Sequence, residues 1–145
     1  MDNVQSINIY TDGGSRGNPG ESALGVFIQD GDGNTLAEIG KTLGITTNNI
    51  AEYSAILEGL SWTVENKKKM PNLGKVNFYM DSQLASSQLN GVYKIKNANL
   101  RELLFGIRQK EADLGIAVSY SHIRREYNKK ADKLVNLALD GVLDE

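Results

Sequence analysis

Two acidic residues close two short alternating segments of this sequence, and together they could bind a cation. Asp12 follows the run 8–11 (NIYT), and Asp81 follows the run 77–80 (NFYM). Because alternate side chains of a strand share a face, each acid lies in phase with a Tyr and an Asn of its own run. If the two strands are parallel neighbours, the carboxylates come roughly 5 Å apart, the spacing between strands. Such carboxylates repel unless a cation or a proton lies between them, so the pattern predicts a metal site.

Glu52 and Asp132 are two further acids that we expect near the same place. Each lies in the first turn of a predicted helix, on the face that carries apolar residues, since Ile56 follows Glu52 by one turn and Val135 follows Asp132. Each also has an ordinary explanation. Asp132 suits the positive end of a helix, and Glu52 fits a capping box that begins at Asn49. Taken alone, Glu52 is better explained as a cap.

Capping offers an alternative for the other two acids as well. Asp81 or Ser82 could cap a short helix, and Asp12 could be a turn residue before two glycines. Capping does not explain why four acids reach the same end of one sheet. With no cysteine and one histidine, oxygen ligands predict Mg²⁺ or Mn²⁺ rather than zinc. Two such ions about 4 Å apart suit phosphodiester hydrolysis, so the pattern predicts a metal-dependent nuclease.

The elements that position these acids can be predicted from periodicity and turn signals. Residues 13–20 are predicted to be a loop, and residues 30–34 the turn of a hairpin. Three strands joined by short turns, followed by strand–helix alternation, predict an α/β fold with a mixed sheet and helices on its faces. The predicted strands are 7–12, 23–29, about 35–42, 76–80 and 116–121, and the predicted helices are about 48–67 (capped by Asn48 or Asn49), 82–89, about 99–114, and one capped by Asn128 and reaching about 139.

Composition narrows the class of protein. A length of 145 residues suits one domain, and an apolar fraction of 40% supports a folded core. No segment is long and apolar enough to span a membrane, no signal peptide begins the chain, and the lack of cysteine excludes a disulfide framework. We therefore expect a cytoplasmic protein.

Net charge alone does not indicate a nucleic-acid partner, because it is only −2. Three local clusters are basic: 67–69 with Lys75, then Lys94 with Lys96 and Arg101, and the segment 121–133. Each cluster by itself is best explained as a solvated face. They would support nucleic-acid binding only if they border one cleft.

Four motifs, in order and suitably spaced, closely resemble type 1 ribonuclease H. They are Tyr10–Gly20 (YTDGGSRGNPG), Thr47–Glu52 (TNNIAE), Tyr79–Gln83 (YMDSQ), and His122 ten residues before Asp132. The resemblance covers nearly the whole chain. It implies an RNase H-like five-stranded sheet of strand order 3-2-1-4-5, with strands 1–3 antiparallel, strands 1, 4 and 5 parallel, and helices on both faces. It also implies one catalytic domain over residues 1–145 that cleaves the RNA strand of RNA–DNA hybrids endonucleolytically, leaving 5′-phosphate and 3′-hydroxyl ends.

The resemblance assigns roles to the acids and to the histidine. Asp12 would bridge two Mg²⁺ ions, Glu52 and Asp81 would hold the ion nearer the leaving oxygen, and Asp132 would hold the ion that carries the attacking water. We expect Mn²⁺ to support activity too. His122 matches the family's mobile histidine, which assists proton transfer or product departure, and imidazole groups titrate near neutrality. Without the resemblance, a lone histidine is an ordinary exposed loop residue.

Substrate recognition is also implied by the resemblance. Neutral amides suit the ribose 2′-hydroxyl, and the matching positions are Asn18, Asn48 and Gln83, with backbone amides near Gly13. Thr47 matches a residue that binds a phosphate of the DNA strand. The ordinary alternatives are a turn residue for Asn18 and a helix cap for Asn48. The glycine-rich segment lacks the GK[ST] ending of a Walker loop, so nucleoside triphosphate binding is not expected.

The chain departs from the family pattern in three places. Gly91–Asn99 is short where many members carry a long basic handle, and Ile45 stands where a basic residue is common. His122–Asn128 resembles the shorter loop of archaeal and some bacterial members, some of which also cut double-stranded RNA. We therefore expect weaker hybrid affinity, resting on the basic residues of 94–101 and 124–133, with double-stranded RNA as a candidate second substrate.

Three other functions fit parts of the pattern. A non-catalytic hybrid-binding module would be favoured by loss of a carboxylate, yet all four are present. An excised domain of a reverse transcriptase, or a relative of the transposases and resolvases, is disfavoured because residues 1–145 read as a complete domain. A simple cation-binding protein leaves the amides unexplained. A monomer is the expected state.

Overall fold

The computed structural model describes residues 1–91 and 95–142. They form one five-stranded sheet of order β3-β2-β1-β4-β5, which confirms the predicted strand order. The strands are β1 (Ser6–Gly17), β2 (Gly20–Asp30), β3 (Thr35–Thr46), β4 (Lys75–Met80) and β5 (Ala117–His122); the helices are α1 (Asn48–Asn66), α2 (Gln83–Leu89), α3 (Ala98–Leu114) and α4 (Lys129–Leu139), with 3₁₀ turns η1 (Lys67–Lys69) and η2 (Arg125–Tyr127). No helix in the described ranges is long and apolar enough to cross a membrane.

Strand pairing follows the predicted directions. β1 lies at the centre, with β2 antiparallel on one side and β4 parallel on the other, and β5 continues parallel to β4. Asn8 lies opposite Asn77, and Tyr10 lies opposite Tyr79. Their side chains share a face as predicted, because the Asn77 amide donates to Asn8 Oδ1 at 3.2 Å and the tyrosine rings stack 5.1 Å apart.

The predicted loop over residues 13–20 is wrong. β1 continues to Gly17 and pairs with β2 up to Gly17 opposite Gly20, so only the cis Asn18–Pro19 step separates the strands. Composition suggested a turn because glycine is rare inside strands. Here a long hairpin supplies the backbone hydrogen bonds, and glycines at positions 13 and 14 lie where helices pack close to the strand.

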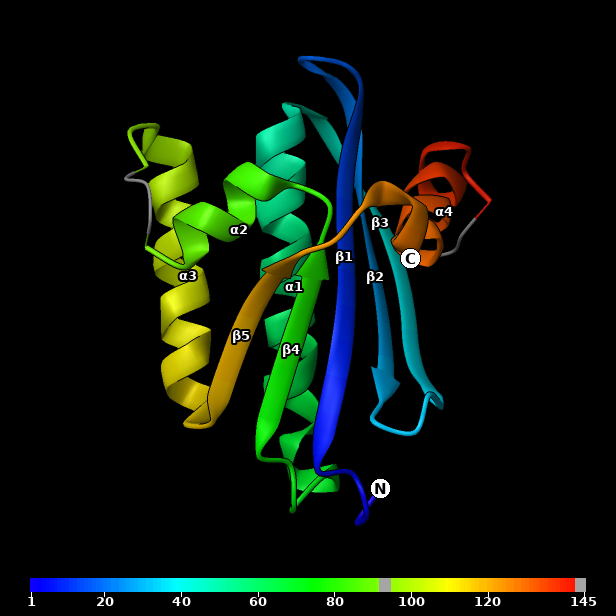
Figure 1. Ribbon diagram of the computed structural model, residues 1–145. Helices are drawn as coiled ribbons and strands as arrows, with labels where there is room; N and C mark the ends of the chain where they lie inside the picture. Colours follow the sequence, from blue (N-terminus) through cyan, green and yellow to red (C-terminus); the bar gives the residue numbers. More distant parts are fainter. Residues whose placement is uncertain (92–94, 143–145) are drawn as a thin grey trace.

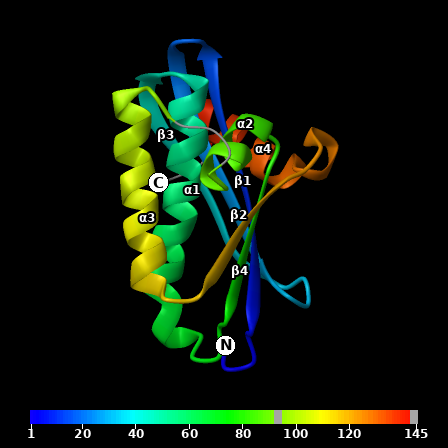
Figure 2. The same ribbon diagram turned by 60° about the vertical axis from the view of Figure 1, so that its left-hand side comes forward.

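Helices cover both faces of the sheet, as predicted. α1 packs across β1 and β2 with α3 beside it, and α4 lies on the opposite face over β1, β2 and β3 (Figure 1). On the α4 side, the figure shows β4 and β5 uncovered by any helix. A turned view separates the α1–α3 layer from the sheet (Figure 2).

Two apolar clusters of very different size hold these layers. The large one lies between the sheet and α1, α2 and α3, and includes Ile9, Phe78, Ile56 and Leu60, each at most 1% exposed. The small one lies under α4 and consists of Ala23, Val135 and Ala138, with Leu139 packed against it. Hence α1 is anchored by the main core, whereas α4 has little apolar support.

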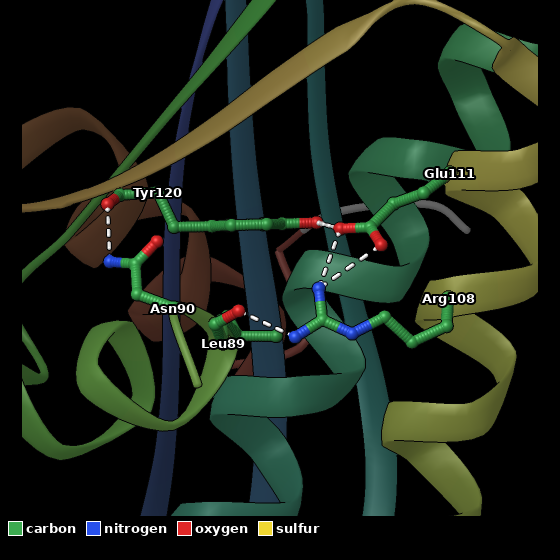
Figure 3. Close-up of polar contacts among 5 residues, drawn as sticks. All are labelled: Leu89, Asn90, Arg108, Glu111 and Tyr120. Atoms are coloured by element: carbon green, nitrogen blue, oxygen red, sulfur yellow. Dashed lines mark hydrogen bonds and ion pairs between the residues drawn. The ribbon is translucent and has the colours of Figure 1, made fainter. Parts of the chain in front are cut away.

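A polar network fastens α2 and α3 to β5 (Figure 3). The Tyr120 hydroxyl donates to Glu111, and Arg108 donates to both oxygens of Glu111 and to the Leu89 carbonyl. The Asn90 amide donates to the Tyr120 carbonyl at 3.0 Å. Burial and the Glu111 carboxylate together raise the pKa of Tyr120, so the hydroxyl keeps its proton and acts as donor. Every named group here has a partner, which makes the cluster structural.

Candidate active site

Asp12 and Asp81 lie at the ends of two neighbouring parallel segments. Thr11 pairs with Met80, the last residue of β4, so Asp12 and Asp81 are the next residues along each chain. Thr11 and Met80 are buried on the α1 side, which leaves Asp12 in phase with Tyr10 on the other face. The two carboxylates are close enough that the charge of Asp81 raises the pKa of Asp12. The predicted proximity is therefore confirmed.

Glu52 is not a capping residue. The N-cap of α1 is Thr47, whose hydroxyl accepts from the Ile50 amide at 3.2 Å, so the predicted caps Asn48 and Asn49 are wrong. With the cap at Thr47, Glu52 falls beyond the first turn and the capping box does not form. Its carboxylate instead borders a small cavity with Asp12 and Asp81.

Gly13 explains how Glu52 comes so close to the strand. A Cβ atom at Gly13 would lie 2.2 Å from the Ala51 carbonyl carbon and 2.3 Å from the Glu52 nitrogen. Any side chain would therefore push the first turns of α1 away from β1. The Gly13 amide donates to Asp12 Oδ1 at 3.0 Å.

Asp81 is also free of a capping role. The N-cap of α2 is Ser82, whose hydroxyl accepts from the Ala85 amide at 3.1 Å. Ser82 in addition makes a side-chain hydrogen bond with Glu52, which opposes the effect of burial on the pKa of that acid. The cap of α2 thus helps to orient Glu52 while Asp81 stays available.

Asp132 reaches the cluster from the other face of the sheet. It lies in the first turn of α4, and its carboxyl group hydrogen-bonds with that of Asp12. Gly25, opposite Asp12 in the register, permits this contact, since a Cβ atom there would lie 2.3 Å from the Ala131 oxygen. The two helices that carry Glu52 and Asp132 can therefore pack close to the sheet because each meets a glycine there.

The electrostatics of the cluster centre on Asp12. Burial first, and then the charges of Asp81, Asp132 and Glu52, raise the pKa of Asp12 from 3.8 to about 8. Burial also raises the pKa of Glu52, with a smaller contribution from Asp81. Near neutral pH, the cluster needs a proton or a cation to compensate its charge.

The donor set fits a hard divalent cation. The four groups are carboxylates without sulfur or imidazole among them, and the cavity of about 10 Å³ between Asp12, Glu52 and Asp81 has room for about one water-sized particle. In the described part of the chain, no group of three or more His, Cys, Asp or Glu side chains is already arranged so that it could hold a metal ion. The acids are neighbours around Asp12, and Mg²⁺ completes its shell with waters and substrate oxygens.

His122 borders the cluster without entering it. It is the last residue of β5 and lies opposite Met80 in the register, beside Asp81, and its side chain is exposed. The Ile123 amide donates to the Met80 carbonyl at 2.8 Å, which fixes where the loop leaves the sheet. The side chain of His122 is therefore open to solvent at the end of the strand that neighbours β4.

The predicted substrate-binding residues gather around the start of α1, apart from Gln83. The Asn48 amide donates to Asn18 Oδ1 at 3.1 Å, so the tip of the β1–β2 hairpin is tied to the helix that Thr47 caps. Gln83 is exposed and begins α2, directly after Asp81 and Ser82. Their predicted contacts with substrate stay predictions.

The basic clusters do not all border the site. Lys67–Lys69 and Lys75 lie at the far end of α1 and at the start of β4, the opposite end of that strand from Asp81 (Figure 1). The basic residues of 124–133 are exposed around the start of α4, beside Asp132. Lys96 and Arg101 are exposed near the start of α3, and Lys94 lies outside the described residues.

Sequence reasoning missed three residues that shape the site. Asn128 was assigned as a helix cap, but its side chain makes no cap bond and donates to the Thr11 carbonyl at 2.9 Å. Ser82 contacts Glu52, and Gly25 admits α4. Only Gly25 left a signal, because glycine inside an apolar strand indicates a close approach of backbone.

The comparisons with known proteins agree with this geometry. A model of the family described as "Reverse transcriptase-like" matches residues 10–138. The chain is 37% identical to "Ribonuclease HI" of Halobacterium salinarum, over 92% of this chain and 64% of the relative. It is 32% identical to "Ribonuclease H" of Clostridium botulinum, over 94% of this chain and 97% of the relative.

Solved structures show the same relation. LC11-RNase H1, isolated from compost by a metagenomic approach, matches with a TM-score of 0.88 and 42% identity, over 99% of this chain and 100% of that one. A second structure of LC11-RNase H1, in complex with an RNA/DNA hybrid, matches with a TM-score of 0.87 over 95% of this chain and 99% of that one.

Fold and sequence together define an RNase H-like domain. The chain belongs to the ribonuclease H family, in its type 1 group. It spans 64% of the length of the Halobacterium relative and 35% of that of the mycobacterial relatives. The single-domain organisation, monomeric state and cytoplasmic location stay predictions.

Proposed function

We propose that this chain is a metal-dependent endonuclease that hydrolyses the RNA strand of RNA–DNA hybrids, leaving 5′-phosphate and 3′-hydroxyl ends. The observation that carries the proposal is the convergence of three carboxylates on Asp12 of β1, from α1, the end of β4, and α4. Capping, the ordinary explanation, fails for Glu52 and Asp81 because Thr47 and Ser82 are the caps. The hybrid-bound structure of LC11-RNase H1, 42% identical, supports the choice of substrate.

Asp12, Glu52, Asp81 and Asp132 would hold two Mg²⁺ ions, and Mn²⁺ would substitute. When bound, the ions would stabilise charge on the attacking and leaving oxygens of the phosphodiester. Without a cation, the raised pKa of Asp12 would keep this central carboxyl group protonated. Binding of a cation would compensate the neighbouring charges, and Asp12 would then release its proton. Glu52 is held in orientation by Ser82.

Other residues of the chain would handle protons and the substrate. His122 would receive or deliver a proton at an imidazole nitrogen near the scissile bond, or assist departure of the product, because its side chain is exposed beside Asp81. Thr47, at the start of α1, would face a DNA phosphate, which suits the positive end of a helix. Asn18, Asn48 and Gln83 would bind ribose 2′-hydroxyls with the Gly13 backbone amide.

The test is Asp12→Asn, which removes the central charge with almost no change of volume. We expect hybrid cleavage to fall below detection while circular dichroism and thermal unfolding show a folded protein. Asp113→Asn, at an exposed acid on α3, is the matched control and should cleave like the natural chain. EDTA should stop the reaction, and Mg²⁺ or Mn²⁺ should restore it. Near-normal cleavage by Asp12→Asn, or in chelator, contradicts the proposal.

Substrate class can be resolved on the same gels. End-labelled RNA–DNA hybrid, double-stranded RNA and single-stranded RNA are incubated with equal enzyme. We expect cleavage of the hybrid first, with double-stranded RNA as the candidate second substrate. Cleavage of single-stranded RNA at the rate of the hybrid would contradict recognition of a hybrid duplex.

A further inference from the structure

Asn128 is a buried amide whose bonding does not match its place in the fold. It occupies the N-cap position of α4 and is 1% exposed, yet its side chain does not bond the helix amides. Its Nδ2 group donates to the Thr11 carbonyl on β1 at 2.9 Å, across 117 residues of chain. The side chain therefore joins α4 to the central strand.

The two ends of this connection are adjacent to two acids of the site. Thr11 directly precedes Asp12, and the backbone carbonyl of Asn128 accepts from the Asp132 amide at 3.1 Å. Asn128 is thus bonded both to Thr11, the residue before Asp12, and to the backbone amide of Asp132. No other described residue bonds to both of these groups.

The amide makes this connection at a cost. Asn128 Oδ1 is buried and has no hydrogen-bond partner within the described ranges. Because a carbonyl only accepts, Nδ2 must face Thr11, and Oδ1 is left on the other side. A buried polar atom without a partner destabilises a fold, so an apolar side chain of similar size would suit stability better. Because Asn128 lowers the stability of the fold in this way, we expect it to have another role.

Apolar packing at the start of α4 is limited. Ala131 is buried against Gly25 and Lys130 lies over the Phe27 ring, whereas Val135 and Ala138 of the small cluster lie C-terminal to Asp132. The last residues before the helix, Arg125–Tyr127, form an exposed 3₁₀ turn. The Asn128–Thr11 bond is therefore a fixed point at the end of α4 that carries Asp132.

We propose that Asn128 is a positioning residue that holds the carboxylate of Asp132 against that of Asp12 through the Thr11 carbonyl and the Asp132 amide. The inference rests on the proposed function, because it concerns two of the acids assigned there to the metal ions. Asn128 contacts neither substrate nor ion in this role. Its effect is on the distance between two ligands.

The test compares Asn128→Leu and Asn128→Asp with a matched variant, Asn90→Leu. Leucine fills the volume without a donor, and aspartate keeps the shape but puts an acceptor opposite the Thr11 carbonyl. Asn90 makes the same kind of bond, from its amide to the Tyr120 carbonyl of β5, away from the acids (Figure 3). Three quantities are measured for each folded variant: the affinity for Mn²⁺ alone by calorimetry, and kcat and KM for hybrid cleavage.

We expect both Asn128 variants to lower kcat at least 30-fold and Mn²⁺ affinity at least 5-fold, with KM changed less than 3-fold. Asn90→Leu should lose thermal stability but keep Mn²⁺ affinity and kcat within 2-fold. Folded Asn128 variants with the natural kcat and Mn²⁺ affinity would overturn the inference, and so would failure of both to fold, because Asn128 would then serve stability alone. A natural chain that neither binds Mn²⁺ nor cleaves hybrid would overturn the proposed function itself.

Discussion

Helices α1 and α4 bring an acid to the same carboxylate from opposite faces of the sheet, but they are held in different ways. α1 is embedded in the main core through residues such as Tyr53, Ile56 and Leu60. α4 rests on four buried side chains, Ala131, Leu134, Val135 and Ala138, and on the Asn128 hydrogen bond. Glu52 is therefore positioned by apolar packing, whereas Asp132 depends on a glycine contact and a polar bond.

The comparison shows that the start of a helix can be held close to a strand either with or without a large apolar core. The backbone of each helix packs directly against the backbone of a strand, α1 at Gly13 and α4 at Gly25. On the α1 side, displacement would disturb many buried contacts. On the α4 side, it would disturb few, so Asp132 should be the easier acid to misplace without unfolding the protein.

The largest expected loss of activity comes from adding a methyl group at Gly13 or at Gly25. Gly13→Ala and Gly25→Ala should each lower hybrid cleavage at least about 100-fold, because a shift of about 1 Å in a reacting group has that effect. Gly13→Ala should also cost about 3 kcal/mol of unfolding free energy, since α1 cannot move freely, and Gly25→Ala about 1 kcal/mol. Chemical denaturation and cleavage assays measure both.

Gly106→Ala is the control for this pair. Gly106 lies inside α3, and its Cβ atom would lie 3.6 Å from Leu57 of α1, an ordinary contact, so stability should rise slightly and cleavage should not change. Full activity in Gly25→Ala would show that α4 does not need its close approach. Equal losses of stability in the two site variants would contradict the difference between the two faces.

Truncation of one buried side chain on each face should separate stability from activity. Leu60→Ala should cost about 2–5 kcal/mol of unfolding free energy, yet the folded fraction should still cleave well. Val135→Ala should cost only about 1.5 kcal/mol but lower cleavage by the folded protein more, because it loosens α4. Urea unfolding curves and cleavage at low temperature test this, and the reverse order would refute it.

The stability of the metal-free protein should fall as pH rises from about 4 to about 8. Asp12 has a pKa raised from 3.8 to about 8, so in this range the folded state binds a proton that the unfolded state has lost. One such group gives a slope of at most about 1.4 kcal/mol per pH unit. Asp12→Asn should remove most of the slope and Asp113→Asn should not; an unchanged slope in Asp12→Asn would contradict the coupling.

The smallest effect is expected at the far end of α4. Arg16 and Asp140 form an ion pair at 2.7 Å, with side chains about half exposed, between the tip of β1 and the end of the helix. Asp140→Asn should cost less than about 0.5 kcal/mol and leave cleavage within 2-fold, because exposed pairs contribute little. Thermal unfolding at low and high salt measures the pair. A large loss of activity would mean that both ends of α4, rather than its start, position Asp132.

Much of the fold and part of the site could be predicted from residue types and their spacing. Alternation in 8–11 and 77–80 predicted two strands, and the pairing of Tyr10 with Tyr79 shows that they are parallel neighbours. The extent of β1 was missed, because glycines at 13, 14 and 17 resemble a loop when local preference alone is considered. The cap of α1 was assigned one or two residues away, since several polar residues at its start could have served, whereas Ser82, one of the two candidates for α2, is its cap.

The sequence by itself determined which acids exist and which elements carry them, because those depend on periodicity and on connections between neighbours in the chain, while the order of the strands was implied by the family resemblance. Only the tertiary structure decided that Asp12 faces the α4 side, that Glu52 is free of its helix cap, and that Asn128 bonds Thr11. These features depend on contacts between residues far apart in the chain. Burial and the approach of charges, which together raise the pKa of Asp12, exist only once both helices have packed against the sheet.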